Sequence, residues 1–488
     1  MKKTQNYFKW LGLFLSTLLL IAFSARSVTA ATPKHYDELE FPPLSEVQLP
    51  DYDRYQLDNG IVVYLVQDRE LPLVGGTALF KTGSRLEPTD KIGLAGLTGA
   101  VMRSGGTQKH PPNELNETLE SLAASVETGI GETSGSAGFN TLSEDLEQVF
   151  SLFAEVIQEP AFDTAQFELA KKQIEGGIAR RNDDPDNIAS REFSKLIYGD
   201  KSPYARTIEY EYLDNISRQD LIDFYHRSFR PEQMLLGIIG DFDRDRMKAL
   251  IAEKFGRWQP KATDPLPPIP NISDRQKSGT FFIEQPQLTQ SYIQIGHLGG
   301  VLKNPDYPAL SVLNGVLNGF GGRLFNEVRS RQGLAYSVYG FWSPQYDYPG
   351  MFIAGGQTRS DATVPFIQAI FKEIEVLRTS PISQEELDYA KESILNSFVF
   401  NFQEPGQTIQ RLMRYEFYGY PPDYIFQYQR GIKATTIEDV QRVAQKYLYP
   451  DRLTTLVVGN SADIQPPLSN LDDNVKIVDI TIPSSQKS

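Results

Sequence analysis

The sequence contains no cysteine and only four histidines, two kinds of residue that enzymes often use for chemistry. Its 488 residues include no cysteine, which excludes disulfides, thiolate zinc sites and cysteine nucleophiles. Histidine is scarce, and no two of the four lie within five residues of each other: His35, His110, His226 and His297. The helical histidine pair that often binds a metal is therefore missing from the sequence, and no local metal site of the usual kind is predicted.

Positive charge is also in short supply. The chain carries 48 Lys and Arg against 62 Asp and Glu, a net charge of −14. Nucleic-acid binding proteins usually present a basic surface, so no nucleic-acid partner is expected. Hydrophobic residues make up 40% of the chain, which is enough to build the cores of two or three domains.

Only one long apolar run is present, "LGLFLSTLLLIAF" over Leu11–Phe23. It is short for a membrane span, it follows Lys2 and Lys3, and the small residues of "SVTA" end at Ala30. These features predict a cleaved signal peptide over residues 1–30 and export to the periplasm or the outside. An uncleaved membrane anchor is the alternative.

The rest of the chain divides into two similar halves. A proline-rich segment over 259–278 predicts a linker between domains at 31–258 and 279–488, the second ending in a polar tail from about residue 461. "FELAKKQIEGGI" from Phe167 matches "LDYAKESILNSF" from Leu387, and Pro185 matches Pro405 at the same offset. This pattern predicts a duplicated domain.

Each half mixes strand and helix patterns. "GIVVYLVQD" and "MLLGIIGDF" are typical of buried strands. "PPNELNETLESLAASV" and "LSEDLEQVFSLFAEVIQ" predict amphipathic helices, with Asn113 and Ser143 as candidate N-caps. The sequence therefore predicts an α+β fold of two similar domains in tandem.

A glycine-rich stretch, "GLAGLTGAVMRSGGT" from Gly93, has the pattern of a core helix. Leu94, Leu97 and Val101 recur at the spacing of one buried helix face. A glycine inside a helix costs about 1 kcal/mol relative to alanine, so the glycines among these leucines need an explanation.

This stretch, together with "YQLDNGIVVYLVQD", "NDDP", "SPYARTI" and "LNGFGGRLFNEVRSRQGLAYSVY", resembles the M16 zinc peptidases. That family includes pitrilysin, insulin-degrading enzyme and the mitochondrial processing peptidase. The resemblance extends from about residue 52 to 459. It implies two tandem M16-type domains, each a mainly antiparallel sheet packed with helices, in a half-length chain of the M16B type.

The family's zinc residues are replaced in this sequence. In the family, "GLAHFLEH" supplies two histidine ligands and a general base, and a later glutamate completes the site. The resemblance places the histidines at Gly96 and Ala100, the base at Gly99 and the later glutamate at Gly177. We therefore expect no zinc and no catalytic residue in this chain alone.

Two acidic residues lie near the last of these positions. Glu168 and Glu175 are two residues out of register with the family's glutamates, which is about 200° around a helix. They are expected to face away from the site as solvated helix charges.

The second half keeps a different pair of family residues, Arg329 and Tyr336. The resemblance implies that they hold the substrate backbone and stabilise the oxyanion. A guanidinium is a permanent cation and a phenol is a neutral donor, which suits this role. A surface salt-bridge arginine and a strand tyrosine are the structural alternative. The preceding loop "NGFGGR" is predicted to be either a mobile segment or a plain turn.

The resemblance also implies that an edge strand binds substrate by strand addition. The matching stretch is about 125–133, where Glu127 and Thr128 replace the usual Asn-Ala.

These features favour a non-catalytic subunit of an exported M16 zinc endopeptidase. The partner subunit is expected to hold an intact zinc motif and the zinc, and a peptide is the expected substrate. A structural or assembly protein of the same fold, a peptide-binding protein and a stand-alone enzyme with other chemistry are the alternatives, and whether the chain is itself part of an enzyme stays open.

Overall fold

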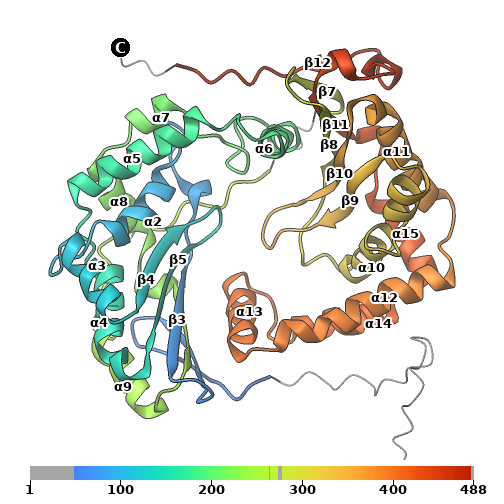
Figure 1. Ribbon diagram of the computed structural model, residues 1–488. Helices are drawn as coiled ribbons and strands as arrows, with labels where there is room; N and C mark the ends of the chain where they lie inside the picture. The colour runs from blue at the N-terminus through green and yellow to red at the C-terminus, as the bar shows by residue number, and fades with distance from the viewer. Residues whose placement is uncertain (1–48, 263, 273–276, 485–488) are drawn as a thin grey trace, which may run out of the picture. The chain divides into compact units, whose positions relative to one another are not determined.

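The computed structural model of the chain describes residues 49–262, 264–272 and 277–484 (Figure 1). The predicted signal peptide lies outside the described residues. Two six-stranded sheets organise this part of the chain. Both sheets are mostly antiparallel and packed with helices, which confirms the predicted α+β class.

The first sheet has the strand order β1-β2-β6-β3-β5-β4. Only β2 and β6 pair in parallel, and the other neighbours are antiparallel. The predicted strands at the start and end of the first half form the buried centre of this sheet. The bounds are β1 Asp53–Gln56, β2 Val62–Gln67, β3 Leu73–Phe80, β4 Ser125–Ile130, β5 Gly135–Leu142 and β6 Met234–Gly240.

Helices from the same half cover one face of the first sheet (Figure 1). The helix predicted from the glycine-rich stretch is present as α2. Two predicted caps are wrong: Pro111 precedes α3 in place of Asn113, and Asp145 precedes α4 after a short 3-10 turn at Ser143. The helices are α2 Leu94–Ser104, α3 Pro112–Ser121, α4 Leu146–Gln158, α5 Thr164–Ala179, α7 Tyr210–Asp214, α8 Arg218–Ser228 and α9 Arg244–Phe255.

The second sheet repeats the pattern in the order β12-β7-β11-β8-β10-β9. Its strands are β7 Gly279–Glu284, β8 Gln290–Leu298, β9 Ala335–Ser343, β10 Met351–Arg359, β11 Thr454–Gly459 and β12 Lys476–Ile477. The helices of this half are α10 Tyr307–Leu317, the π-helical segment η5 Leu324–Arg331, α11 Thr363–Thr379, α12 Gln384–Phe398, α14 Tyr424–Ala434 and α15 Ile437–Tyr447. The matching strand orders agree with the duplication.

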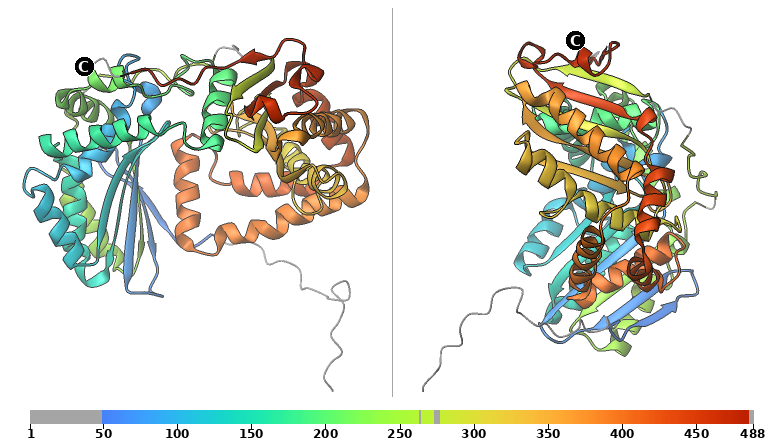
Figure 2. Two further views of the ribbon diagram at one scale, coloured as in Figure 1. Left: turned by 45° about the horizontal axis from the view of Figure 1, so that its top comes forward. Right: turned by 90° about the vertical axis from the view of Figure 1, so that its right-hand side faces the viewer.

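The two halves exchange one helix each. Helix α6 (Pro185–Tyr198) packs its apolar side chains on the second sheet, where Gln294 donates to Ser190 at 3.0 Å. Helix α13 (Pro405–Phe417) packs on the first sheet, with Met413 seated over Gly237. Figures 1 and 2 show both helices beside the sheet of the other half.

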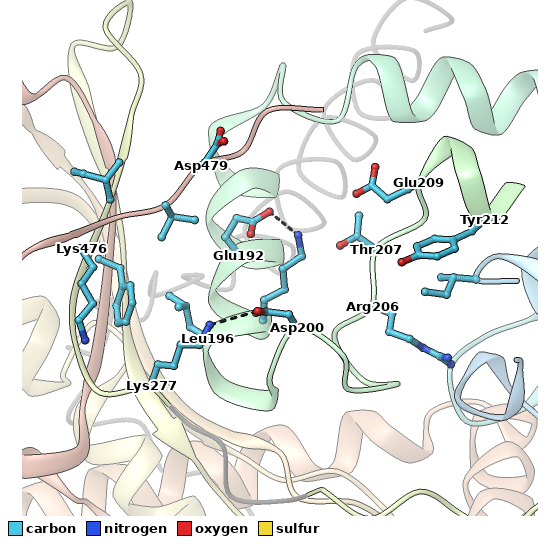
Figure 3. A pocket seen from close by; sticks show the side chains of 15 residues that line it. Glu192, Leu196, Asp200, Arg206, Thr207, Glu209, Tyr212, Lys277, Lys476 and Asp479 are labelled. Carbon is cyan, nitrogen blue, oxygen red and sulfur yellow. Dashed lines mark hydrogen bonds and ion pairs between the residues drawn. The ribbon is translucent and has the colours of Figure 1, made fainter. Parts of the chain in front are cut away.

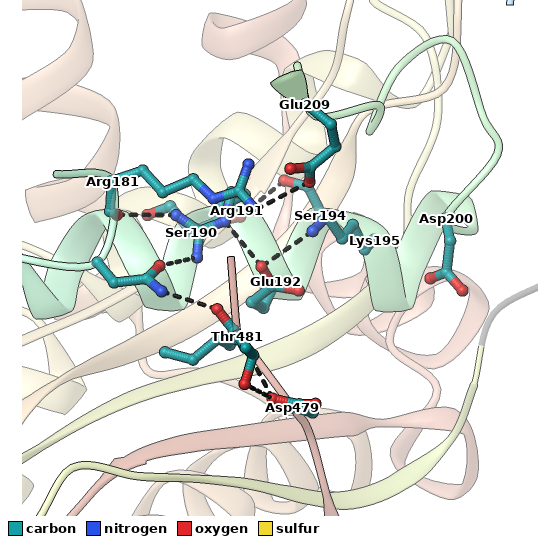
Figure 4. A network of polar contacts seen from close by, with 12 residues as sticks. Arg181, Ser190, Arg191, Glu192, Ser194, Lys195, Asp200, Glu209, Asp479 and Thr481 are labelled. Carbon is teal, nitrogen blue, oxygen red and sulfur yellow. Dashed lines mark hydrogen bonds and ion pairs between the residues drawn. The ribbon is translucent and has the colours of Figure 1, made fainter. Parts of the chain in front are cut away.

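The C-terminal segment also links the two halves. After β12, the amide of Val478 donates to Phe282 O at 2.9 Å, and Asn182 Nδ2 donates to Ile480 O at 2.8 Å. Asn182 in turn accepts from Arg191 Nη2 at 2.8 Å, which joins the segment to the polar network around α6 (Figure 4).

Polar contacts tie the first sheet to loops of the second half. Arg85 Nη2 lies 2.7 Å from Asp347 Oδ2 in a nearly buried pair, and the hydroxyls of Thr133 and Tyr418 are 2.7 Å apart. Separating Arg85 from Asp347 would leave a largely desolvated charge without its partner, which is costly. None of the helices in the described residues is long and apolar enough to cross a membrane.

Candidate functional site

Helices α2 and α5 carry the positions that the resemblance assigns to the family's zinc ligands. They pack against each other, and Gly96, Ala100 and Gly177 are all exposed. A Cβ atom added at Gly96 or Gly177 would meet no other atom within 4 Å. Packing therefore leaves room for side chains at these positions, and the sequence simply does not provide them.

Gly99 is in a different situation. A Cβ atom there would lie 2.4 Å from the backbone nitrogen of Ile130 and 2.8 Å from the carbonyl carbon of Gly129, both in β4. The hydroxyl of Thr128 donates to Gly99 O at 2.6 Å and holds the helix against the strand. Glycine is thus required for this close approach, and no glutamate fits unless the helix moves away.

The residues present do not fit a zinc ion. A catalytic zinc needs three ligating side chains, and none of Gly96, Gly99, Ala100 and Gly177 has a donor atom. Glu168 is exposed and Glu175 is half-buried on α5. Across the described ranges, no three histidine or carboxylate side chains come together to hold a metal.

A buried carboxylate fixes the start of α2. Glu87 accepts hydrogen bonds from the amides of Gly93 (3.1 Å) and Ala95 (3.0 Å) and lies 3.9 Å from Arg206 Nη2. Burial raises the pKa of Glu87, although these amides and Arg206 oppose the shift. Sequence reasoning missed this contact, because Glu87 lies outside any helix pattern and Arg206 belongs to the distant "SPYARTI" motif.

Arg329 and Tyr336 lie together in the second half. The Arg329 guanidinium lies between two rings, 4.8 Å from the centre of Phe325 and 5.3 Å from that of Tyr336. Tyr336 is 80% exposed, and neither the guanidinium nor the phenol hydroxyl has a hydrogen bond or ion pair within the described part of the chain. Two stacked rings restrain the guanidinium and leave its N–H edges free to bind a ligand.

The glycine-rich loop before Arg329 is anchored on both sides. Asn318 exchanges hydrogen bonds with the backbone of Gly340, Gly321 N donates to Tyr389 at 3.0 Å, and Arg323 forms a two-pronged ion pair with Glu386. These contacts hold the loop in place as an anchored turn. Its tip, Phe320, is 81% exposed and packs edge-on against Phe325, which extends the aromatic surface around Arg329.

The predicted substrate strand β4 is the edge of the first sheet. Glu127 is exposed, but the hydroxyl of Thr128 is turned onto α2, and Arg103 Nε donates to Val126 O at 2.7 Å. Side chains of α2 and β4 therefore occupy part of this edge.

A pocket of about 580 Å³ lies where the C-terminal segment passes α6 (Figure 3). Four of its charged groups form two pairs: Lys195 Nζ is 3.0 Å from Glu192 Oε1, and Lys277 Nζ is 3.4 Å from Asp200 Oδ2. None of the predicted site residues lines it. The surface around Arg329 is therefore the stronger candidate.

Comparison with known proteins agrees with the fold. Residues 73–209 match the family described as Insulinase (Peptidase family M16), and residues 215–394 match the Peptidase M16 inactive domain. The chain is 23% identical over 360 residues to YmxG of Bacillus subtilis, an uncharacterized zinc protease, covering 73% of this chain and 86% of that protein. It is 23% identical over 420 residues to an uncharacterized zinc protease of Rickettsia felis, covering 83% and 96%.

Solved structures show the same similarity. A peptidase M16 inactive domain from Pseudomonas fluorescens has a TM-score of 0.76 at 27% identity and covers 86% of this chain and 100% of its own. A protease from Helicobacter pylori shares the fold with a TM-score of 0.74 at 20% identity, covering 84% of this chain and 100% of its own. The duplicated α+β domains, the ordered motifs and these matches show that the chain belongs to the M16 family of peptidases.

Proposed function

We propose that this chain is the non-catalytic subunit of an exported M16-type zinc endopeptidase. In this proposal a partner subunit with an intact His-x-x-Glu-His motif holds the zinc and the general base. This chain contributes Arg329 and Tyr336, which bind the peptide backbone and stabilise the oxyanion at the scissile carbonyl.

The observation that carries the proposal is the restrained, unpaired Arg329. The half-buried guanidinium of Arg329 packs on the rings of Phe325 and Tyr336, and its N–H groups have no hydrogen-bond partner within the described residues. Donors fixed in advance in this way stabilise developing negative charge by about 3 kcal/mol. The glycines and alanine at the family's zinc positions support the other half of the division, since this chain offers no metal ligands there.

The test is to co-express the chain with an M16 chain from the same genome that has the intact motif, and to measure peptide hydrolysis by the purified complex. Arg329→Ala is expected to lower turnover by about 100-fold, with Arg331→Ala on the same segment as the matched control. Turnover that does not change with Arg329→Ala would remove the assigned role. A complex that binds peptide but never cleaves it would favour a peptide-binding or assembly protein.

A further inference from the structure

The turns of two equivalent hairpins meet between the halves of the molecule. Residues 131–134 join β4 to β5, and residues 344–350 join β9 to β10. The short 3-10 helix η2 (Ser84–Leu86) contacts both turns: Ser84 N donates to Gly131 O at 2.9 Å, and Arg85 Nη2 lies 2.7 Å from Asp347 Oδ2. We call the contact of these three segments the clasp.

Aromatic side chains of the first half hold the turn at 344–350 in place. Tyr348 stacks on Tyr204 with ring centres 4.1 Å apart, and the hydroxyl of Tyr198 donates to Pro349 O at 3.0 Å. Asp347, the residue before Tyr348, is thereby carried into surroundings that contain little water, where charges interact strongly.

The clasp contains several buried polar atoms without a partner. Nε and Nη1 of Arg85, Oδ1 of Asp347 and Oε1 of Glu132 are all buried, and none forms a hydrogen bond within the described residues. Buried polar groups are nearly always hydrogen-bonded, so such a concentration in one place needs an explanation. The charges are also unequal in number, because one guanidinium serves two carboxyl groups.

The carboxyl group of Glu132 is the one without an ion-pair partner of its own. Burial raises the pKa of Glu132, and the charge of Asp347 adds to this shift. A hydrogen bond from Tyr348 and the charge of Arg85 oppose it. Within the described residues, the titratable and charged groups that face this carboxyl are Arg85, Tyr198, Tyr204, Asp347 and Tyr348.

We propose that the clasp is a pH-sensitive switch, in which protonation of Glu132 closes the turn at 344–350 onto the first half and ionisation loosens it. With Glu132 protonated, Arg85 and Asp347 form a neutral pair. With Glu132 ionised, the clasp holds one uncompensated negative charge, which water solvates better when the turn is open. The inference goes beyond the proposed function, because it holds whether or not the chain takes part in proteolysis.

The test measures opening of the clasp in the full chain by hydrogen–deuterium exchange of the backbone at residues 344–350. Dividing the exchange rate of the wild type by that of Glu132→Gln at the same pH removes the intrinsic pH dependence of exchange. This ratio should rise by about tenfold from pH 4.5 to pH 8, since only the wild type gains a buried charge. Glu127→Gln removes an exposed carboxyl from the same hairpin and is the matched control, which should follow the wild type at every pH.

Asp347→Asn is a second test, which a purely structural role would not satisfy. It leaves Glu132 as the remaining carboxyl beside Arg85, so ionisation should now tighten the clasp and the pH dependence should reverse its sign. The double variant Glu132→Gln/Asp347→Asn is the reference for this measurement. A wild-type ratio that stays constant with pH, or a pH dependence that keeps its sign in Asp347→Asn, would overturn the inference.

Discussion

The sheets of the two homologous domains have equivalent edge strands, β4 and β9. The helices packed beside these two strands cover them to different extents. In the first domain, α2 lies so close to β4 that Gly99 touches the backbone of Ile130, and Arg103 occupies the carbonyl of Val126. In the second domain, asparagine side chains at the end of α10 hydrogen-bond to the backbone of β9 at Gly340 and Trp342 and leave Val338 uncovered. The edge strand β4 is therefore packed closely against its helix, whereas part of the β9 edge is not covered.

This difference shows how the first domain departs from a metal site. Gly96 and Gly177, which the resemblance assigns to zinc ligands, border open space that a substitution alone could fill. At Gly99, the position that the resemblance assigns to the base, packing is involved as well, because α2 lies too close to β4 for a glutamate to fit. In the second domain, by contrast, the guanidinium of Arg329 and the outward backbone groups of Val338 have no hydrogen-bond partner within the described residues.

The largest expected effect on stability distinguishes Gly99, which contacts β4, from Gly96, which faces open space. Gly99→Glu forces a side chain into the backbone of β4 and buries a carboxylate, so the free energy of unfolding should fall by at least about 3 kcal/mol. Gly96→Glu places the same side chain in open space and should change stability by less than about 1 kcal/mol. Urea unfolding of the two variants measures the difference. Equal losses would show that Gly99 is not a packing requirement.

Two buried groups, His297 in the second domain and Glu87 in the first, should respond to acid in opposite directions. Burial lowers the pKa of His297 in β8 to about 4, while its Nδ1 lies 2.9 Å from Leu298 O and Nε2 accepts from the amide of Tyr449. The unfolded chain therefore takes up this proton first, and stability at His297 is lost as the pH falls from 6.5 towards 4. Burial raises the pKa of Glu87, so the folded first domain takes up this proton before the unfolded chain does, and lowering the pH through that pKa favours the folded state at this site.

For His297 the loss between pH 7.5 and pH 5 should be about 2 kcal/mol. The measurement compares the free energy of unfolding of the wild type and His297→Gln across this range. The wild type should lose its advantage over the variant by about that amount as the pH falls. A constant difference between the two proteins would show that His297 does not titrate as its burial indicates.

The smallest expected effect is a gain in stability from a substitution at Gly96. Gly96 is helical and exposed, and a methyl group there meets no other atom. Gly96→Ala should therefore raise the free energy of unfolding by about 0.5–1 kcal/mol, since alanine favours the helix. Thermal unfolding is a sufficient measurement. A destabilised variant would mean that the surface of α2 is covered by something other than solvent.

Local patterns in the sequence predict much of this fold. The strands around Val63 and Leu236 and the buried face of α2 follow from apolar spacing, which depends only on neighbouring residues. The duplication explains why five strands of each sheet share one order, whereas the outer strands β1 and β12 come from opposite ends of their domains. The resemblance also singled out Arg329 and Tyr336, and the structure places them in contact.

Other features depend on distances that no local pattern contains. The apolar faces of α6 and α13 predict burial, but not that each helix packs on the sheet of the other half. Strand β12 has two residues, too few for a strand signal. In the sequence Asn314 looks like an ordinary polar helix residue and Asn318 like the first residue of a loop, because their role at the β9 edge appears only when the sheet is built.

The central claim is that this chain supplies Arg329 and Tyr336 to a zinc site on another subunit. The direct measurement is peptide hydrolysis by the chain alone, by its zinc-bearing M16 partner alone, and by the two together. We predict little hydrolysis by either alone, strong hydrolysis by the pair, and a loss of about 100-fold with Arg329→Ala. Full activity of the partner without this chain, or with its Arg329→Ala variant, would contradict the account.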